Sequence, residues 1–325
     1  MARTLFVTGG AGYVGSHCCK AFAAAGWRIV VFDNLSRGWR EHVKWGELVE
    51  GDILDAAALN AAMSATKPDA VAHFAALAYV GESFETPAEY YRTNTTGMLN
   101  LLDAMRGAGV GRILFSSSCA TYGAPDRLPI DEMTAQAPIN PYGWSKLISE
   151  KMLEAYGHAY GLRSVALRYF NAAGDDGEME IGEKHEPETH MIPLAIMAAQ
   201  SGGVFRINGD DFDTRDGTAV RDYIHVTDLA DAHCRAVAYL MDGGTSDVFN
   251  LGTGGGMSVA EILDAIERVS GAKIAREFVA RRPGDPPALV ASADKARRVL
   301  GWEPKHSDID EIITSAWRWH GRNSS

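Results

Sequence analysis

The chain has 325 residues, of which 46% are hydrophobic, and a formal net charge of −11 at pH 7. The apolar content suffices for one large or two moderate cores, and the acidic balance argues against a general nucleic-acid or anionic-membrane surface. No charged leader and no apolar stretch of about 18 residues is found, so we expect neither a signal peptide nor a membrane span. Four cysteines without metal-ligand spacing indicate reduced thiols in a cytoplasmic protein, with no metal site: Cys18, Cys19, Cys119 and Cys234.

Short apolar runs alternate with helical patterns through the first half of the chain. Residues 5–8 predict a first strand, and residues 12–25 predict a helix that Gly26 ends. The runs are continuously apolar, as in strands that are covered on both faces. Repeated strand–helix–strand units predict an α/β fold with a Rossmann-type, doubly wound parallel sheet. Further strands are expected at 28–32, 48–50, 70–73, 112–116 and 165–168.

The second half of the chain is less regular. Ser258 and Glu261 have capping-box spacing and open a helix to about Val269, so residues 252–256 form a loop that feeds this helix. We expect a first domain at 1–172, to which segments near 222–252 return, and a smaller α+β substrate-binding domain at 173–325. The later elements expected are a loop at 174–190, a helix at 192–199, an apolar run at 205–207, a helix at 225–242 and a strand at 247–251.

A glycine-rich turn joins the first strand to the first helix in the stretch FVTGGAGYVGSH, residues 6–17. Gly9, Gly12 and Gly15 are spaced three apart. Such a turn allows close backbone approach to a pyrophosphate, and the helix N-terminus offers free N–H groups to it. Asp33 ends the next strand, where a carboxylate accepts the ribose hydroxyls of NAD and repels a 2′-phosphate; its alternative is a turn or N-cap residue. The pattern favours NAD over NADP, although Arg37 keeps NADP open.

A tyrosine and a lysine lie four residues apart in NPYGWSKLISEKML, which begins at Asn140. Tyr142 and Lys146 share a helix face, and residues 116–118 are serines that end a strand upstream. Lowering a tyrosine pKa from about 10 towards 7 needs about 4 kcal/mol. One ammonium at about 5 Å supplies roughly 3 kcal/mol, so a cationic nicotinamide must supply the rest. Ser118 would hold the substrate hydroxyl. The alternative is a surface tyrosine–lysine pair.

Several long motifs resemble the extended short-chain dehydrogenase/reductases, and within them the UDP-glucose 4-epimerases. The resemblance spans essentially the whole chain. It implies that Tyr142 acts as base on the 4-hydroxyl of a UDP-sugar while C4 gives a hydride to tightly bound NAD. The 4-keto sugar then turns over, and hydride returns to its opposite face. The motifs are TGGAGYVGSH, DNLSRG, HFAALAYVGES, FSSSCATYG, PYGWSK, LRYFNAAG, VRDYIHVTDLADAH and ARRPGD.

The resemblance also implies the site residues. For the UDP-sugar it suggests Asn171, Arg221 and Arg282 at the diphosphate and Asp285 at the uridine ribose. His190 aligns near the sugar-nucleotide loop; its alternative is an exposed loop histidine without a ligand. Alternatively, Arg221 pairs with the adjacent Asp222, and Arg282 is a solvated loop charge. The residues expected to contact NAD are Gly9, Gly12, Tyr13, Val14, Gly15, Asp33, Asn34, Asp52, Ile53, Phe74, Ala75, Ala76, Asn94, Ser116, Tyr142, Lys146 and Tyr169.

Two departures from the family pattern bear on ligand contacts. Some relatives have lysine where this chain has Ala78, which removes one cofactor contact. Some have tyrosine where this chain has Leu289, a residue expected to line the sugar. The smaller leucine leaves room for a 2-acetamido group, so UDP-N-acetylhexosamines are alternative substrates.

Three rival functions differ in chemistry or in class. A UDP-xylose/UDP-arabinose 4-epimerase uses the same chemistry, and a difference of one hydroxymethyl group is worth only about 1–3 kcal/mol. A nucleotide-sugar 4,6-dehydratase is disfavoured, because its relatives carry an Asp-Glu pair where this chain has Cys119 and Ala120. A non-catalytic NAD-sensing regulator is disfavoured by the intact Tyr142–Lys146 pair. A homodimer is expected from the family, with a helix near residues 94–105 as candidate interface; its apolar residues Met98, Leu99, Leu101 and Leu102 could equally be core.

Overall fold

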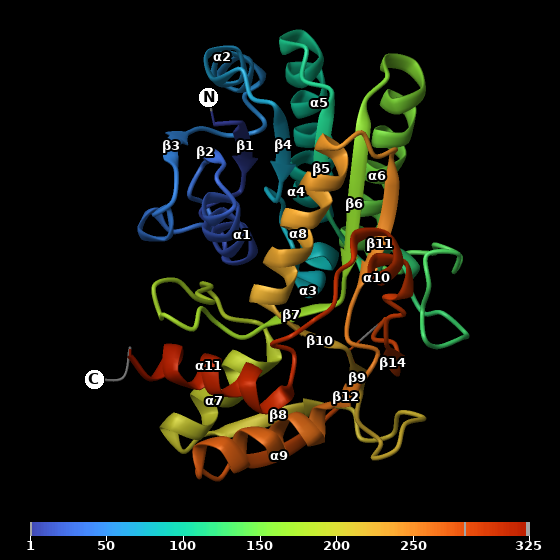
Figure 1. The fold of residues 1–325 in the computed structure, drawn as a ribbon. Helices are drawn as coiled ribbons and strands as arrows, with labels where there is room; N and C mark the ends of the chain where they lie inside the picture. The colour runs from blue at the N-terminus through green and yellow to red at the C-terminus, as the bar shows by residue number, and fades with distance from the viewer. Residues whose placement is uncertain (1, 283, 323–325) are drawn as a thin grey trace.

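The main layer of the fold is a seven-stranded parallel sheet (Figure 1), as seen in a computed structural model that describes residues 2–282 and 284–322. The strand order is β3-β2-β1-β4-β5-β6-β11, and all neighbouring pairs run parallel. The order reverses between β1 and β4, which is the switch point of a doubly wound sheet. The strands are β1 (Thr4–Thr8), β2 (Arg28–Asp33), β3 (Glu47–Glu50), β4 (Ala70–His73), β5 (Arg112–Ser118), β6 (Arg163–Tyr169) and β11 (Asp247–Leu251).

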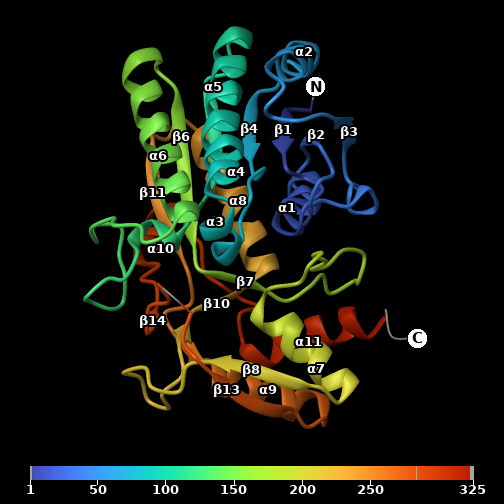
Figure 2. The same cartoon turned by 180° about the vertical axis from the view of Figure 1, so that it is seen from behind.

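Helices cover both faces of this sheet, which explains why its strands are apolar throughout. In β1, Leu5 and Val7 belong to the core on one face and Phe6 to the core on the other, as the two-residue period of a strand dictates. Figure 1 shows α8 in front of the sheet, and Figure 2 shows α5 and α6 on the opposite face. The first face carries α1 (Tyr13–Ala24), α8 (Val226–Met241) and α10 (Asp294–Leu300); the second carries α2 (Ala56–Thr66), α5 (Gly97–Ala108) and α6 (Pro141–Tyr160).

A smaller unit with its own core lies beyond the carboxyl ends of the main strands (Figures 1 and 2). Its core joins apolar side chains of three helices to a two-stranded parallel sheet. Ser258 caps α9 and exchanges hydrogen bonds with Glu261, so the predicted capping box is confirmed. The elements are α7 (Met191–Ser201), β8 (Val204–Asn208), α9 (Val259–Ser270), β13 (Ala275–Val279) and α11 (Ile309–Gly321).

Short elements connect the two units and border the site described below. Parallel pairing joins β7 (Asn171–Ala173) to β10 (Tyr223–His225), and β9 (Val220–Arg221) lies between β12 (Met257–Ser258) and β14 (Ala288–Leu289). The remaining short helices are η1 (Arg40–His42), α3 (Val80–Glu85), α4 (Pro87–Tyr91), the π-helix η2 (Arg92–Thr96) and η3 (Cys119–Tyr122).

The fold class predicted from the sequence is confirmed, and each predicted strand of the sheet is present within a few residues of its expected bounds. Residues 174–190 contain no helix or strand, as expected for a loop. Although β11 lies in the main sheet, the domain boundary at residue 172 stays a prediction. The sequence reading did not anticipate α2, α10, α11 or β13. None of the helices in the described ranges is long and apolar enough to cross a bilayer.

The helix proposed from sequence as a dimer interface is largely committed to the core. Met98, Leu101 and Leu102 are at most 1% exposed and pack with the second-face core. Leu99 is 40% exposed. The alternative interpretation of these four residues as core is therefore confirmed for Met98, Leu101 and Leu102 but not for Leu99.

Candidate active site

The glycine turn between β1 and α1 is shaped by close backbone packing. Gly9 has φ +76°, and a Cβ there would lie 2.4 Å from the Ala75 amide nitrogen. A Cβ on Gly15 would lie 2.2 Å from the Gly9 carbonyl oxygen. In contrast, a Cβ on Gly12 would contact only that oxygen, at 3.4 Å. Gly9 and Gly15 thus allow the strand and the helix to pack closely. Gly12, at the N-cap of the helix, places no side chain over the free amides there.

The N-terminus of α1 is suited to an anion. Gly12 provides no side-chain cap, and the first turn holds no acidic residue. Within the described part of the chain, the amides of Tyr13, Val14 and Gly15 have no hydrogen-bond partner. Because the helix dipole adds partial positive charge at this end, the turn fits the pyrophosphate of a dinucleotide.

Asp33 closes the far end of this turn. Its carboxylate accepts hydrogen bonds from the amides of Ala11 at 3.0 Å and Leu35 at 2.9 Å. Burial raises the pKa of Asp33, and the two amide bonds oppose that shift. The Asp33 side chain thus fixes the turn, which agrees with its alternative interpretation as a turn residue. The remaining lone pairs of its carboxylate can still accept hydrogen bonds from a ribose diol.

Arg37 is not available to a 2′-phosphate. Its guanidinium pairs with Glu82 at 2.6 Å and lies 5.1 Å from the centroid of the Tyr79 ring. Since its charge is already compensated and Asp33 contributes a negative charge nearby, the pocket favours NAD over NADP.

The other predicted cofactor residues gather at the ends of β2, β3 and β4. The Asn34 amide donates to Asp52 at 2.9 Å, and Ile53 is buried beneath Gly97. After β4, the amides of Phe74 and Ala75 both donate to the Thr8 carbonyl, and Ala76 follows. Thus segments distant in sequence lie at one edge of the sheet. Their contacts with a cofactor stay predictions.

Asn94 positions the segment after Ala76 through its side chain. Its amide exchanges two hydrogen bonds with the backbone of Leu77, at 2.8 and 2.9 Å, and donates a third to Ser145 at 2.8 Å. With 3% exposure, it ties this segment to α6. The direct cofactor contact expected for Asn94 stays a prediction.

The expected catalytic residues meet where β5, η3 and α6 converge. Asn140 caps α6 by accepting from the Gly143 amide at 2.7 Å, and a Cβ on Gly143 would lie 2.4 Å from the Ala120 carbonyl. This glycine lets the helix approach η3 closely. As a result, the Tyr142 phenol lies near the Ser118 hydroxyl, which acts to lower its pKa.

Lys146 reaches the end of β5 from the same helix. Its Nζ donates to the Ser116 carbonyl at 2.8 Å and lies 5.8 Å from the centroid of the Tyr142 ring. The Ser116 hydroxyl lies 2.7 Å from the Tyr169 hydroxyl. The tyrosine, lysine and two serines therefore form one buried polar cluster at the same carboxyl edge of the sheet as the dinucleotide turn.

Burial dominates the electrostatics of this cluster. It raises the pKa of Tyr142 to about 12, against the opposing effect of the Ser118 hydrogen bond. It also lowers the pKa of Lys146 to about 7, against the opposing charge of Glu150. The protein alone therefore does not ionise Tyr142 at neutral pH, and further positive charge is needed, as the Coulomb estimate from the sequence anticipated.

The expected nucleotide-sugar residues lie on the short strands beside this cluster. Leu289 of β14 is in register with Arg221 of β9. The backbone N–H of Asn171 in β7 donates a hydrogen bond to the backbone carbonyl of Asp222. Arg221 forms an ion pair with Asp285 and donates to the Pro286 carbonyl at 2.9 Å. Arg221, predicted at the diphosphate, and Asp285, predicted at the uridine ribose, are thus joined by an ion pair.

The alternative pairing of Arg221 with Asp222 is wrong. Asp222 lies between β9 and β10 and is fully buried. Its carboxylate accepts hydrogen bonds from Thr253 and Gly254 and from the Ala291 amide. Asp222 therefore anchors the loop at 252–256, and Arg221 pairs with Asp285 instead.

Leu289 connects the nucleotide strands with the catalytic cluster. It packs against a core group that includes Cys119, the residue after Ser118. Arg221 also lies close enough to Cys119 to lower its pKa, although burial raises that pKa to about 12 overall. The half-buried Leu289 is therefore placed near Ser118, the serine predicted to hold the substrate hydroxyl. Arg282 lies on the exposed loop before Asp285, and its carbonyl accepts from the Asp285 amide.

Comparison with known proteins places this chain in a family. Residues 5–252 match the family model described as "NAD dependent epimerase/dehydratase family". The chain belongs to this family. The match spans the dinucleotide turn, the catalytic cluster and β11, and the resemblance noted in the sequence is confirmed.

Individual relatives of this epimerase/dehydratase family member cover nearly the whole chain. A protein of Rhizobium meliloti (strain 1021) named UDP-glucose 4-epimerase is 56% identical over 99% of this chain and 98% of its own length. The structure of UDP-glucose 4-epimerase from Brucella ovis in complex with NAD is 54% identical, with a TM-score of 0.95, over 98% of this chain and 99% of that one. The enzyme from Stenotrophomonas maltophila, with bound NAD and formylated UDP-arabinopyranose, is 38% identical, with a TM-score of 0.95, over 99% of both chains.

The sequence reading of this family member missed a buried network beneath α6. Arg168 of β6 forms a two-pronged ion pair with Glu150, at 2.9 and 2.5 Å, and Ser117 donates to the same carboxylate at 2.5 Å. Arg168 also donates to the Tyr122 hydroxyl. Glu150 is one helical turn beyond Lys146, so its position on the catalytic face was the available signal.

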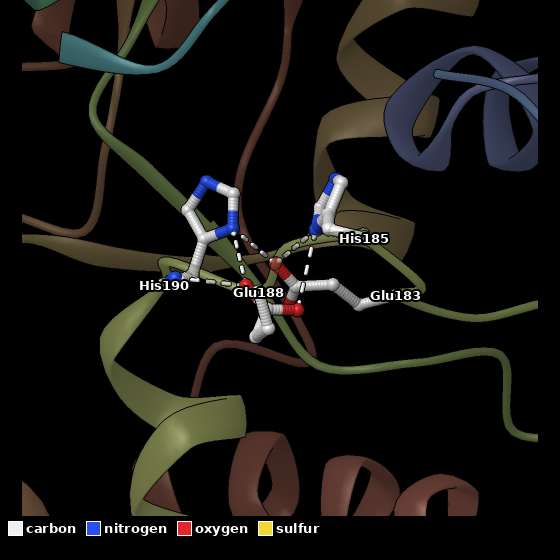
Figure 3. Close-up of side chains that lie close together, drawn as sticks. All are labelled: Glu183, His185, Glu188 and His190. Carbon is white, nitrogen blue, oxygen red and sulfur yellow. Dashed lines mark hydrogen bonds and ion pairs between the residues drawn. The ribbon is translucent and has the colours of Figure 1, made fainter. Parts of the chain in front are cut away.

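The sequence reading also missed the side-chain cluster that contains His190. This residue is half exposed and lies with His185, Glu183 and Glu188 in a cluster on the loop before α7 (Figure 3). A second acidic group, Asp176, Glu178 and Glu180, surrounds the Lys20 ammonium, which compensates its charge.

Proposed function

We propose that the protein catalyses the reversible epimerisation of a UDP-hexose at C4, interconverting UDP-galactose and UDP-glucose, with NAD as a resident cofactor. The observation that carries the proposal is that Tyr142, Lys146 and Ser118 are buried together at the carboxyl edge of the sheet that also carries the uncapped dinucleotide turn. The names and bound ligands of close relatives support it.

The residues of this chain handle the proton of the sugar 4-hydroxyl. The Ser118 hydroxyl and the Tyr142 phenol lie near each other, so together they can accept and return this proton. NAD⁺, when bound, would accept the hydride from C4 of the sugar and would supply positive charge that favours ionisation of the phenol. Lys146 adds to that charge when protonated, and its hydrogen bond to Ser116 fixes its position.

The resident nucleotide would be held by the turn and by the strand ends. The α1 amides face its pyrophosphate, and Asp33 accepts the adenosine ribose hydroxyls. The residues proposed to contact it are those named from the sequence, including Lys146 and Tyr169. Because the reaction has no net redox change, retaining the nucleotide between turnovers is chemically sufficient.

The UDP-sugar would be held by the short strands and the loop before α7. Arg221 and Arg282 meet the diphosphate, Asp285 the uridine ribose, and Asn171 and His190 the sugar-nucleotide backbone. The ion pair of Arg221 with Asp285 supports this, because it orients the guanidinium next to the position of Leu289.

UDP-xylose/UDP-arabinose and UDP-N-acetylhexosamines remain alternative substrates. The half-buried Leu289 leaves more room than a tyrosine would, which favours the acetamido sugars. A Leu289→Tyr variant should lose turnover of UDP-N-acetylglucosamine more than that of UDP-galactose. Equal losses, or no wild-type turnover of the acetamido sugar where UDP-galactose reacts readily, would contradict this reading.

The decisive experiment releases nucleotide from the denatured protein, identifies it, and assays UDP-galactose and UDP-glucose interconversion without added NAD. Tyr142→Phe should retain the nucleotide and lose most activity. Tyr160→Phe is the matched control, because Tyr160 is on the same helix and 58% exposed. Near-normal turnover by Tyr142→Phe would show that another group is the base.

We also propose a homodimer, as in the family. With three of the four apolar α5 residues buried, Leu99 is the one left to contribute to an interface. Size-exclusion chromatography with light scattering tests this, and a monomer at micromolar concentration would contradict it. The cytoplasmic location stays a prediction.

A further inference from the structure

A buried carboxylate lies one helical turn beyond Lys146 on α6. Glu150 Oε1 accepts hydrogen bonds from the Ser117 hydroxyl at 2.5 Å and from Arg168 Nε at 2.9 Å. Its Oε2 accepts from Arg168 Nη2 at 2.5 Å and from the Gln136 amide at 3.1 Å. The side chains of Glu150 and Arg168 are only 7% and 5% exposed. Four hydrogen bonds therefore hold this carboxylate in one position and orientation.

Two of these donors are opposite each other in the main sheet. Ser117 of β5 and Arg168 of β6 are register partners. Phe115 and Ala166, two residues earlier on the same strands, belong to the core on the face that α6 covers (Figure 2). Because side chains alternate along a strand, Ser117 and Arg168 point to that face too. Glu150 thus joins the carboxyl ends of both strands to α6.

The residues beside this register pair belong to the catalytic cluster. Ser116 and Ser118 flank Ser117 in β5, and Ser118 is the register partner of Tyr169. The Ser116 hydroxyl lies 2.7 Å from the Tyr169 hydroxyl, and the Ser116 carbonyl accepts the hydrogen bond from Lys146. Contacts on one face of the sheet therefore fix the backbone that presents the catalytic groups at the strand ends.

The charge of Glu150 also acts on Lys146. The two residues are four apart on one helix, so their Cβ atoms lie about 5–6 Å from each other. Burial lowers the pKa of Lys146 to about 7, and the Glu150 charge opposes this fall. Without the carboxylate, more of Lys146 would be neutral at pH 7, and positive charge that favours ionisation of Tyr142 would be lost.

Arg168 extends the network to the edge of the sheet. Its Nη1 donates to the Tyr122 hydroxyl at 2.8 Å, which donates to the Asn250 side chain of β11 at 2.7 Å. Replacing a buried ion pair by apolar residues is often neutral or stabilising. A contribution to folding is therefore not a sufficient reason for this pair, and its position beneath the catalytic strand ends indicates a second role.

We propose that Glu150 is a positioning residue for the epimerisation: with Ser117 and Arg168 it fixes the strand ends that carry Ser116 and Ser118, and its negative charge stabilises the Lys146 ammonium. The inference rests on the proposed function only for the reaction whose turnover is measured. Because protein donors enclose the carboxylate, Glu150 acts through its neighbours and not on the sugar.

The direct test follows Lys146 in the nucleotide-free protein by NMR of isotope-labelled lysine, with Lys146→Met identifying its signal. The wild-type midpoint should lie near pH 7. Glu150→Gln removes the carboxylate and leaves the Arg168 charge, so the midpoint should fall by about one pH unit or more. The double variant Glu150→Gln/Arg168→Met removes both charges, and its midpoint should lie between those of Glu150→Gln and the wild type.

Glu154→Gln is the matched control for this titration. Glu154 is on the same helix, one turn beyond Glu150, and its side chain is 57% exposed. Its replacement should leave the Lys146 midpoint unchanged. Where Glu150→Gln alone does not fold by circular dichroism, the double variant decides, since it leaves no unpaired buried charge and its midpoint should still lie below that of the wild type.

The other titratable groups around Lys146 and Tyr142 stay uncharged in this pH range. Burial and the charge of Lys146 lower the pKa of His73 in β4 to about 3. Burial raises the pKa of Tyr142 in α6 and of Cys119 in η3 to about 12, and it raises the pKa of Tyr169 in β6. A midpoint between about pH 5 and about pH 9 therefore belongs to Lys146.

Turnover separates positioning from a purely structural role. A midpoint lower by one pH unit makes the Lys146 ammonium about ten times scarcer at alkaline pH, so kcat of Glu150→Gln should fall roughly tenfold at about pH 8. The alkaline decline of kcat should also begin at lower pH than in the wild type. KM for UDP-galactose and the amount of retained NAD should not change, because Glu150 is not among the residues proposed to contact either ligand.

Two results would overturn the inference. One is a Lys146 midpoint in Glu150→Gln, or in the double variant, that equals or exceeds the wild-type value. The other is a loss of turnover that lies in KM alone, with the pH profile of kcat unchanged. In contrast, the expected fall of the midpoint in a protein that epimerises no UDP-sugar would refute the proposed function and leave the action of Glu150 on Lys146 standing.

Discussion

Replacing Lys146 with methionine should stabilise the nucleotide-free protein near pH 6 while abolishing its activity. Lys146 is 4% exposed, and its ammonium donates to the Ser116 carbonyl at 2.8 Å. This single bond does not compensate for burial, which lowers the Lys146 pKa from 10.5 to about 7. A methionine of similar length removes the buried charge and retains most of the apolar stem.

The magnitude follows from the pKa shift. A fall from 10.5 to about 7 corresponds to about 5 kcal/mol at about 1.4 kcal/mol per unit. The unfolded chain binds the proton more tightly, so the wild type is penalised fully below pH 7 and regains stability as pH rises towards 10.5. Allowing about 1–2 kcal/mol for the lost hydrogen bond, the variant should be about 3 kcal/mol more stable at pH 6. At pH 9 this difference should be smaller by about 3 kcal/mol.

Urea unfolding of nucleotide-free protein at pH 6 and pH 9 measures this difference. Lys151→Met is the matched control: this lysine is on the same helix, its side chain is 65% exposed, and it pairs with Glu154 at the surface. Its effect should stay within about 1 kcal/mol at both pH values. The reasoning fails if Lys146→Met is the less stable protein at pH 6, or if its difference from the wild type does not change with pH.

Three further substitutions probe the turn, the network and the cofactor preference. Gly15→Ala should abolish NAD retention, because its Cβ would lie 2.2 Å from the Gly9 carbonyl oxygen; released nucleotide measures this. Arg168→Met leaves Glu150, whose side chain is 7% exposed, without its charge partner and should cost about 3–5 kcal/mol in urea unfolding. Asp33→Ser should reduce NAD retention and narrow the preference for NAD over NADP by at least about tenfold in competitive titration, since one carboxylate hydrogen bond is worth about 1.5–3 kcal/mol.

Controls for these substitutions are available in the chain. Gly111→Ala should retain the nucleotide, because a Cβ there has no neighbour within 4 Å. Arg206→Met breaks only a surface pair with Glu277 and should cost less than about 1 kcal/mol. Normal NAD content in Gly15→Ala, equal costs for the two arginine variants, or an unchanged preference in Asp33→Ser would each contradict the corresponding reasoning.

The sequence by itself determined the features that depend on neighbouring residues. The glycine spacing sets the turn at Gly9, because its positive φ is a local requirement of a tight strand–helix junction. Likewise Asn140 caps α6, and Ser258 with Glu261 caps α9, through bonds that span three residues. Continuous apolar runs identified the buried strands, because period and polarity are read directly from the chain.

The tertiary structure decided which charges meet and how far each is desolvated. Arg221 pairs with Asp285, 64 positions away, rather than with its neighbour Asp222, because the buried Asp222 carboxylate accepts hydrogen bonds from the loop at 252–256 and from Ala291. Burial, not sequence spacing, separates the pKa values of Tyr142 and Lys146 in the protein without nucleotide. The placement of His185 against Tyr13 likewise depends on a long loop crossing from one unit to the other. Such contacts depend on which segments the folded core brings together, and local propensity carries no record of that choice.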